Sequence, residues 1–193
     1  MARHKEFDEK VVLQKAMELF WRQGYEKTSM QDLVTHMGIH RRSIYDTFGD
    51  KHALFLASLK WYETFVFGEL TRIIEKSSSI ETSIRAIFNY VMDMAEGNSY
   101  PAGCFVVNTA VELSLLDKEI QSLTTKMFDD TEELFSQLLT EGKHRGEFSK
   151  DLNTEVTARF LHNNLIGLRV LVKTNYSKKE LESMIELIMK VLT

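Results

Sequence analysis

A short basic and polar cluster, HRRSIY at positions 40 to 45, carries side chains that can read DNA. Arginine can donate two parallel hydrogen bonds to guanine O6 and N7, and tyrosine can reach a phosphate or a thymine methyl group. If the cluster is helical, Arg42 and Tyr45 share one face, with Arg41 at its edge, while Ile44 points the opposite way. A polar, cationic face of this kind fits the major groove. A merely solvated charged face is the alternative.

The segments around this cluster predict a helix-turn-helix. A first helix is expected over about residues 9–23, with Gly24 as its stop. The letters TSMQ at 28–31 match a capping box, in which the threonine hydroxyl takes a free amide and the glutamine reaches back. They begin a second helix that Gly38 ends. A third helix is expected over about residues 40–48, and two short helices joined at a glycine form a helix-turn-helix.

The charge distribution separates this segment from the rest of the chain. The formal net charge is −4, which by itself argues against a nucleic-acid-binding protein. The first 52 residues, however, carry a net charge of +1 and the remainder −5. The two parts therefore differ in electrostatic character.

Composition sets the class of protein. The chain has 193 residues, of which 44% are hydrophobic and 27% charged, as expected for a globular chain of one or two domains. No apolar run is long enough to cross a bilayer, and the letters MARHKEFDEK lack the apolar stretch of a signal peptide. We expect no membrane span and a cytoplasmic location. The one cysteine, Cys104, cannot form an intramolecular disulfide, which fits a reducing compartment.

Catalytic and metal-binding motifs are missing from the sequence. It contains no Walker loop, Gly-x-Ser-x-Gly elbow, His-Glu-x-x-His motif or cysteine pair. His36 and His40 have a metal-like spacing, but Gly38 interrupts the helix between them. We therefore expect a protein that is not an enzyme and has no metal or cofactor.

The stretch TSMQDLVTHMGIHRRSIYDTFGDKHALF, residues 28–55, resembles the DNA-binding domain of the TetR family of bacterial transcriptional regulators. The resemblance covers roughly residues 8–56. It implies an all-α protein with a three-helix helix-turn-helix DNA-binding domain, residues 1–52, and a larger C-terminal helical ligand-binding and dimerisation domain, residues 53–193. It also implies that some side chains contact phosphates and that others face base edges. The residues implied to contact phosphates are Thr28, Tyr45 and Lys51. Those implied to face base edges are His40, Arg41, Arg42 and Ser43. Ser29 completes the DNA-binding set.

The C-terminal part reads as helices over about residues 50–76, 80–96, 104–116 and 118–143, followed by two more. An apolar stripe in the last helix, beside the apolar segment 160–172, suggests self-association through these two C-terminal helices. Gly167 would permit close approach, and the family resemblance implies a four-helix dimer interface. A homodimer would place two recognition helices about 34 Å apart on a palindromic double-stranded operator. Packing within one monomer is the alternative for the stripe, which consists of Leu181, Met184, Ile185, Ile188 and Leu192.

A small-molecule inducer would need a cavity in the second domain. Burying a polar side chain without a partner costs about 1–3 kcal/mol, so interior polar residues would bond a ligand or each other. The polar candidates are Asn108, His162, Asn163 and Asn164. The predicted ligand-binding set combines aromatic and polar residues, with ordinary core packing as the alternative: Trp61, Tyr62, Phe65, Phe88, Met92, Phe105, Asn108, Phe128 and His162.

Cys104 follows the loop 97–103 at a predicted helix N-terminus, where the helix dipole favours a thiolate. A similar Gly-Cys start occurs in a TetR subgroup that includes electrophile-responsive repressors. The sequence thus predicts a ligand-released, homodimeric, DNA-binding repressor that works by population shift. Three alternatives stay open: a regulator that senses electrophiles or redox state through Cys104, a helical enzyme with Cys104 as nucleophile, and an adaptor whose helix-turn-helix binds protein.

Overall fold

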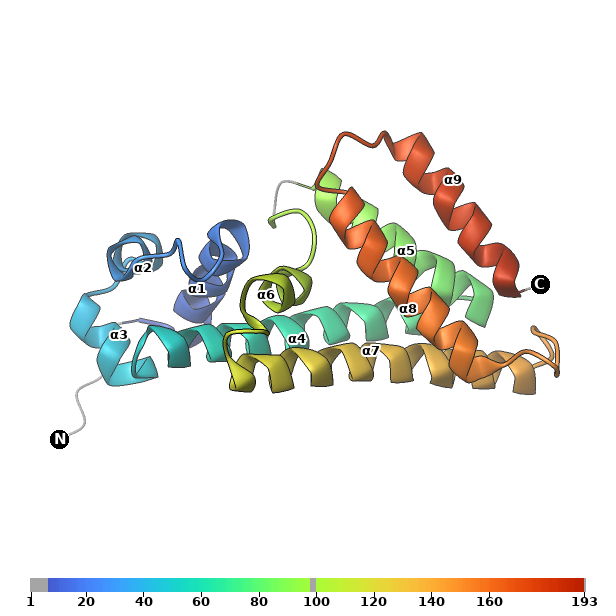
Figure 1. Ribbon diagram of the computed structural model, residues 1–193, viewed down its shortest axis with the longest axis horizontal. Coiled ribbons are helices and arrows are strands. Elements are labelled where there is room, and N and C mark those ends of the chain that lie inside the picture. The colour runs from blue at the N-terminus through green and yellow to red at the C-terminus, as the bar shows by residue number, and fades with distance from the viewer. Residues whose placement is uncertain (1–6, 98–99, 193) are drawn as a thin grey trace.

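The computed structural model describes residues 7–97 and 100–192, and over these it is all-helical, as predicted. Residues 1–6 of the predicted first domain, Asn98 and Ser99 of the predicted loop, and Thr193 lie outside the described residues. The helices appear in chain order in Figure 1. They are α1 (Glu9–Gln23), α2 (Met30–Met37), α3 (Arg41–Phe48), α4 (Lys51–Lys76), α5 (Ile80–Glu96), α6 (Phe105–Leu113), α7 (Lys118–His144), α8 (Thr154–Leu171), α9 (Lys178–Met189) and a terminal 3-10 turn, η1 (Lys190–Leu192).

The helix-turn-helix has the predicted bounds, but its capping box is one residue later than predicted. Ser29 is the N-cap of α2, and Asp32 is the residue that reaches back to it. The Thr28 hydroxyl instead donates to the carbonyl oxygen of Gly24 at 2.6 Å. Thr28 is therefore committed to the preceding turn, and the predicted pairing of Thr28 with Gln31 is wrong.

Gly38 makes the turn between α2 and α3. Its φ of +73° is a left-handed conformation that few other residues adopt without strain. The chain then re-enters a helix at Arg41, with His40 as the N-cap. Ile44 is fully buried beneath α3, so the exposed side of this short helix is fixed relative to the domain core.

The long helix α4 joins the two halves of the molecule. It begins directly after the helix-turn-helix, packs against α1, and continues alongside α5 in the C-terminal half (Figure 1). The other long helix, α7, packs against α6 and α8. The core is continuous from α1 through α4 to α6, because Phe55 makes edge contacts with both Phe20 at 4.9 Å and Phe105 at 5.4 Å between ring centroids.

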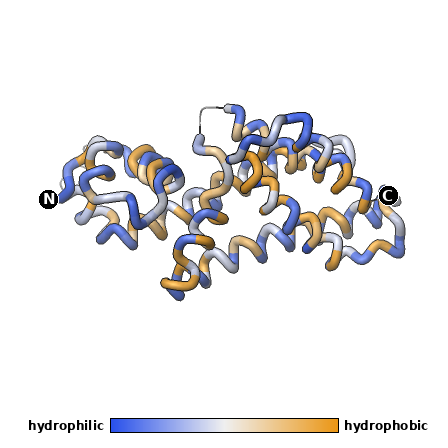
Figure 2. The backbone as a smooth tube through the Cα atoms, turned by 45° about the horizontal axis from the view of Figure 1, so that its top comes forward, coloured by the Kyte–Doolittle hydropathy of each residue, from blue (hydrophilic) through white to orange (hydrophobic). Residues whose placement is uncertain are grey.

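The C-terminal helices bury the apolar stripe that the sequence suggested for dimer formation. Leu181, Ile185, Ile188 and Leu192 are all buried within the single chain, where α9 packs against α5 and α8. Hydrophobic and hydrophilic positions alternate along the helices (Figure 2), as expected when one face of each helix meets the core. The predicted dimer role of these side chains is thus corrected to monomer packing. None of the described helices combines the length and apolarity needed to cross a membrane.

Candidate DNA interface and effector crevice

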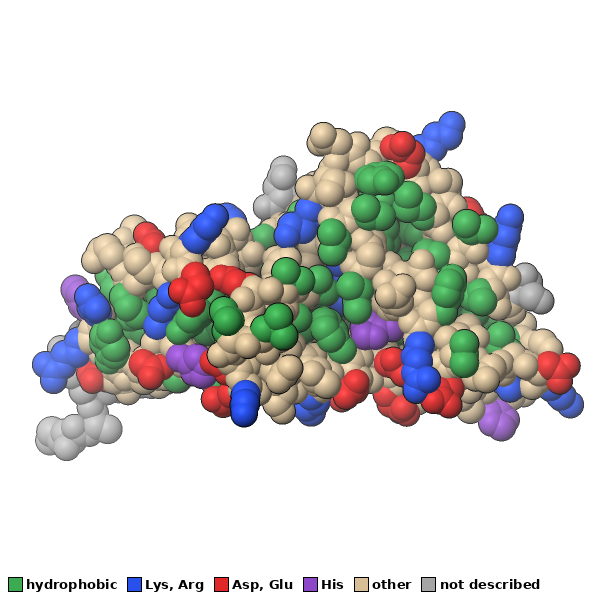
Figure 3. All heavy atoms as spheres, in the orientation of Figure 1, with side chains coloured by type: hydrophobic (Ala, Val, Ile, Leu, Met, Phe, Trp, Pro, Cys, Tyr) green, Lys and Arg blue, Asp and Glu red, His purple; other side chains and the backbone are tan. Residues whose placement is uncertain are grey.

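The exposed side of α3 carries the basic cluster singled out in the sequence. His40, Arg41, Arg42 and Tyr45 are all exposed, and Lys and Arg side chains gather at this end of the molecule (Figure 3). The Arg41 guanidinium carbon lies 5.7 Å from the centroid of the Tyr45 ring. Arg42 Nε lies 3.5 Å from Asp46 Oδ2. Solvent-exposed pairs of this kind contribute little free energy, so these cations can exchange their partners for phosphates or bases.

The N-terminus of α3 has no side-chain cap. His40 makes no capping hydrogen bond, whereas Asp8, Ser29 and Asp50 cap α1, α2 and α4. The first-turn amides of α3 thus have no side-chain acceptor, and the helix dipole favours negative charge at this point.

The other predicted DNA contacts differ in accessibility. Lys51 is half-buried, with Nζ 4.1 Å from the Tyr25 ring centroid, and Ser43 is half-buried on α3. Ser29 is exposed, but its hydroxyl donates to Asp32. This bond lowers the pKa of the Asp32 carboxyl below its ordinary value. Thr28 is fully buried, so its side chain lies away from the surface where a phosphate contact was predicted.

Two acidic side chains of the C-terminal half hold the DNA-binding half directly. The Glu112 carboxylate of α6 accepts hydrogen bonds from the backbone amides of Tyr25 at 3.0 Å and Glu26 at 2.9 Å. At the start of α7, Asp117 Oδ2 lies 2.8 Å from His52 Nε2. Backbone bonding from Ile120 and the contact with His52 lower the pKa of Asp117. Neither contact has a signal in the sequence, because the partners are more than 60 residues apart.

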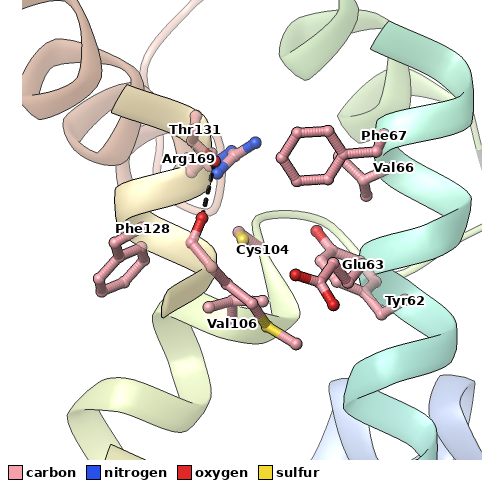
Figure 4. A pocket seen from close by; sticks show the side chains of 10 residues that line it. Tyr62, Glu63, Val66, Phe67, Cys104, Val106, Phe128, Thr131 and Arg169 are labelled. Atoms are coloured by element: carbon pink, nitrogen blue, oxygen red, sulfur yellow. Dashed lines mark hydrogen bonds between the residues drawn. The ribbon is translucent and has the colours of Figure 1, made fainter. Parts of the chain in front are cut away.

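A crevice opens between α4 and α7, with the start of α6 and the end of α8 at its back (Figure 4). The cavity itself holds about 20 Å³, and the space around it that is open to solvent brings the total to about 320 Å³. Apolar side chains make up most of the wall, and a few polar ones converge on the space, as in many small-molecule sites. The lining residues are Tyr62, Glu63, Val66, Phe67, Cys104, Val106, Met127, Phe128, Thr131 and Arg169.

Only part of the predicted ligand set lines this crevice. Tyr62 and Phe128 do, together with the predicted sensor Cys104, whereas Phe105 packs behind Tyr62 at 5.8 Å between ring centroids. Asn108 faces a separate open groove and accepts a hydrogen bond from Lys173 at 3.0 Å. The remaining members, which pack elsewhere in the core or are half-buried, are Trp61, Phe65, Phe88, Met92 and His162.

The interior asparagines of α8 are also placed differently from the prediction. Asn163 is exposed, and Asn164 donates to the carbonyl oxygen of Phe160 within its own helix at 2.7 Å. Neither needs a ligand. His162 is buried, and its Nε2 has no hydrogen-bond partner among the described residues. Burial and the nearby charge of Arg169 lower the pKa of His162.

Arg169 is among the crevice residues that the sequence analysis missed. It follows buried Leu161, Leu165 and Leu168 on α8, and as the fourth residue after Leu165 it lies on the same buried face. An arginine in such an apolar stripe is the sequence signal that could have identified it. The structure also shows no group of three or more metal-ligating side chains among the described residues.

Comparisons with known proteins agree with both halves of this arrangement. Residues 12–58 match the family model described as bacterial regulatory proteins, tetR family. Residues 81–188 match the model described as tetracyclin repressor-like, C-terminal domain. The two models together span the helix-turn-helix and most of the C-terminal helices.

Individual relatives extend over nearly the whole chain. The uncharacterized HTH-type transcriptional regulator YezE of Bacillus subtilis is 32% identical over 193 residues, all of both chains. The HTH-type transcriptional repressor ComR of Escherichia coli is 29% identical over 93% of this chain and 86% of its own length. A cysteine mutant of the TetR family transcriptional regulator CifR, solved with 26bp operator DNA, superposes with a TM-score of 0.89. It is 25% identical over 97% of this chain and 98% of its own.

Proposed function

The chain belongs to the TetR family of DNA-binding transcriptional regulators, and from this premise we propose that it is a homodimeric repressor that a small molecule releases from its operator. The observation that carries the proposal is the link between the exposed basic face of α3 and the crevice. That link runs through α6, which begins at Cys104 in the crevice and holds the α1–α2 turn through Glu112. The relatives support a regulator without enzymatic activity, and its action on bacterial DNA implies a cytoplasmic location.

The proposed DNA contacts follow from the placement of the α3 side chains. Arg41 and Arg42 face base edges in the major groove, where a bidentate arginine contact discriminates by about 1–3 kcal/mol. Tyr45 and Lys51 bind phosphates and fix the register of the helix. Ser29 and His40 flank this surface at the N-termini of α2 and α3. The side chain of Thr28 is buried, so it contributes to DNA binding only by fixing the turn that precedes α2.

The proposed dimer uses the exposed side of α8 and α9. Apolar residues remain exposed on α8 at Val156, Phe160 and Val170, with Gly167 between them, and Leu187 on α9 is 68% exposed. Successive α8 positions in this set are four, seven and three residues apart, so they share one face. Apolar side chains gather over these two helices in Figure 3. Two copies that join these faces would form a symmetric four-helix interface.

The oligomeric state can be tested with a single charge. Phe160→Glu places a carboxylate at the centre of the proposed interface and should convert the dimer to a monomer in sedimentation equilibrium. Leu115→Glu is the matched control, because Leu115 is exposed in the turn before α7, away from the exposed side of α8 and α9. A dimer that survives Phe160→Glu would rule out this interface.

The proposed release mechanism is a shift of α6 between two positions. Tyr62 connects the crevice to the DNA-binding half as well, because its ring contacts Trp21 of α1 at 4.9 Å between centroids. A ligand that wedges between α4 and α7 would favour a conformation with misplaced recognition helices. Changing the ratio of the two conformations from 99:1 to 1:99 requires about 5.5 kcal/mol of differential ligand affinity.

Selection from random duplex DNA at fixed salt tests the proposal. The wild-type protein, Arg42→Ala and the control Arg72→Ala are compared, because Arg72 is exposed at the far end of α4. We expect a palindromic consensus that Arg42→Ala relaxes at particular base pairs and Arg72→Ala leaves intact. A consensus without two-fold symmetry would contradict the dimer. No enrichment with ligand-free, refolded protein would contradict the repressor.

A further inference from the structure

Arg169 has an unusual environment for a charged side chain. It is 8% exposed, although arginine is rarely buried to this degree without a paired acid. Its guanidinium lies at the crevice between α4 and α7, close to Thr131 and Phe67 (Figure 4). No ion pair joins Arg169 to a carboxylate in the part of the chain that the structure describes.

The two phenols near Arg169 do not neutralise its charge. Its electrostatic neighbours are Tyr62, Tyr90 and Cys104. Burial raises the pKa of Tyr62 well above its ordinary value, and burial together with the charge of Glu69 raises the pKa of Tyr90 to about 12. Both phenols are therefore uncharged at neutral pH.

One carboxylate lines the crevice, and its ion pair is with a lysine and not with Arg169. Glu63 lines the same crevice, but its Oε1 lies 3.6 Å from Lys126 Nζ, whose side chain is on the exposed side of α7. The buried guanidinium thus has no ion pair with a carboxylate in the described part of the chain. Such an arrangement costs folding free energy, and a bound anion would remove that cost.

The geometry points to a specific ligand class. We propose that the crevice binds a small organic carboxylate, with Arg169 holding the carboxylate group and the apolar body lying against Val66, Phe67 and Val106. A guanidinium presents a planar fork of donors that matches a carboxylate in a bidentate manner. The hydroxyl of Tyr62 also points into the space (Figure 4). This inference rests on the proposed function, because it names the chemistry of the ligand that releases the operator.

The loop before α6 helps to build this site. Gly103 has a φ of +89°, and a Cβ there would lie 3.0 Å from the carbonyl oxygen of Arg169 and 2.6 Å from Lys173 Cδ. The absence of a side chain lets the loop pack directly on the end of α8. The next residue, Cys104, then closes the back of the crevice beside Arg169.

Matched pairs of small molecules provide the test. Hexanoate and benzoate are compared with hexanamide and benzamide, which have the same apolar bodies and no charge. Thermal unfolding and titration calorimetry on the full chain should show binding of at least one carboxylate and of neither amide. In Arg169→Met the affinity for that carboxylate should fall about 10- to 100-fold, the range for a hydrogen bond to a charged group. Arg169→Lys keeps the charge but not the planar fork of donors, and its affinity for the carboxylate should fall less than that of Arg169→Met.

The unliganded variants separate ligand binding from a structural role. Arg169→Met should leave the melting temperature of the free protein unchanged or higher, because it removes an uncompensated charge. A structural arginine would give a lower melting temperature instead. Arg159→Met is the control on the same helix, since Arg159 is exposed and paired with Glu132 and Glu155. It should leave carboxylate binding unchanged.

Several results would overturn the assignment. These are equal binding of acids and amides, unchanged affinity in Arg169→Met, or no binding of either carboxylate. Operator binding that no carboxylate affects would overturn the ligand class and leave the repressor proposal standing. Carboxylate binding by a protein that selects no DNA sequence would overturn the repressor proposal and leave the ligand class standing.

Discussion

The surface of α3 carries its charged side chains in solvent, whereas the crevice holds a charged side chain in the protein interior. The α3 cluster draws its groups from one eight-residue helix in water, where each cation makes at most a weak local pair. The crevice draws its residues from positions 62 to 169 and buries an arginine that makes no ion pair with a carboxylate among the described residues. Before DNA binds, the charges on the α3 surface are hydrated, and keeping them there costs little free energy. The charge in the crevice has lost such hydration even before a small molecule binds.

The two regions nevertheless share one local feature. Among the nine α-helices of the described residues, α3 and α6 alone begin without a side-chain cap, at His40 and Cys104. A missing N-cap costs about 0.5–2 kcal/mol. Each of the two proposed binding sites thus lies beside a helix N-terminus that no side chain caps.

The largest effect is expected at the exposed region. Replacing Arg41 and Arg42 together with alanine removes two proposed base contacts, each worth about 1–3 kcal/mol. Affinity for the selected operator, measured by fluorescence anisotropy at fixed salt, should fall by about 100-fold or more. The melting temperature should change little, because both side chains are exposed.

A matched double variant controls for the loss of charge. Arg72→Ala with Arg145→Ala removes two exposed arginines from parts of the chain outside the helix-turn-helix. It should weaken DNA binding only slightly. Equal losses in the two double variants would mean that net charge, and not the α3 surface, sets the affinity.

The second effect concerns the connection between the two regions. Both oxygens of Glu112 accept backbone amides, so Glu112→Gln forces an amide NH₂ group towards one of these donors. We expect the free energy of unfolding to fall by about 1.5–3 kcal/mol, as measured by urea denaturation. Glu182→Gln, an exposed substitution on α9, is the control. An unchanged stability in Glu112→Gln would show that the two hydrogen bonds to Glu112 do not help to hold the two halves together.

The helix-turn-helix was largely predictable because its signals are local. Gly24 and Gly38 end their helices as expected, and the apolar period of residues 9–23 matches α1. The error at Thr28 came from two adjacent hydroxyl residues, either of which could cap α2. The choice between them depends on the bond from Thr28 to Gly24, which arises from the path of the preceding turn.

The crevice and the packing of α9 were not predictable in the same way. Periodicity identified an apolar stripe at Leu181 and Ile185 but could not decide whether α5 or a second copy covers it. Aromatic residues such as Phe88, which packs against Phe135, have the same pattern in a solid core as around a cavity. The apolar stripe of α8 could have marked Arg169 as buried, but its place in the crevice required knowledge of its neighbours, which come from α4, α5 and the start of α6.

A third effect addresses the thiol in the crevice. Cys104 is buried, so iodoacetamide should modify it only when the crevice opens locally. An attached group would occupy the space beside Arg169, and we expect operator affinity to fall by about 5-fold or more, within the usual range of coupling between sites. Cys104→Ser treated in the same way should keep its affinity. Full modification with intact DNA binding would exclude a sensing role for this cysteine.

The smallest effect is a pH dependence that only the buried region can have. The pKa of His162 lies below its ordinary value because burial and Arg169 disfavour the imidazolium, against the opposing charges of Glu132 and Asp129. On acidification the unfolded chain takes up this proton near pH 6.5 (about the unperturbed pKa), while the folded protein does so only at lower pH. The free energy of unfolding should therefore be constant above that pH and decline just below it. The slope should be less than about 1.4 kcal/mol per pH unit, the value for one whole proton taken up on unfolding. The decline should disappear in His162→Gln and persist in the exposed-site control His144→Gln. If His162→Gln does not alter the decline, another group titrates in this range. The buried surroundings of His162 would then make no contribution to the pH dependence of stability.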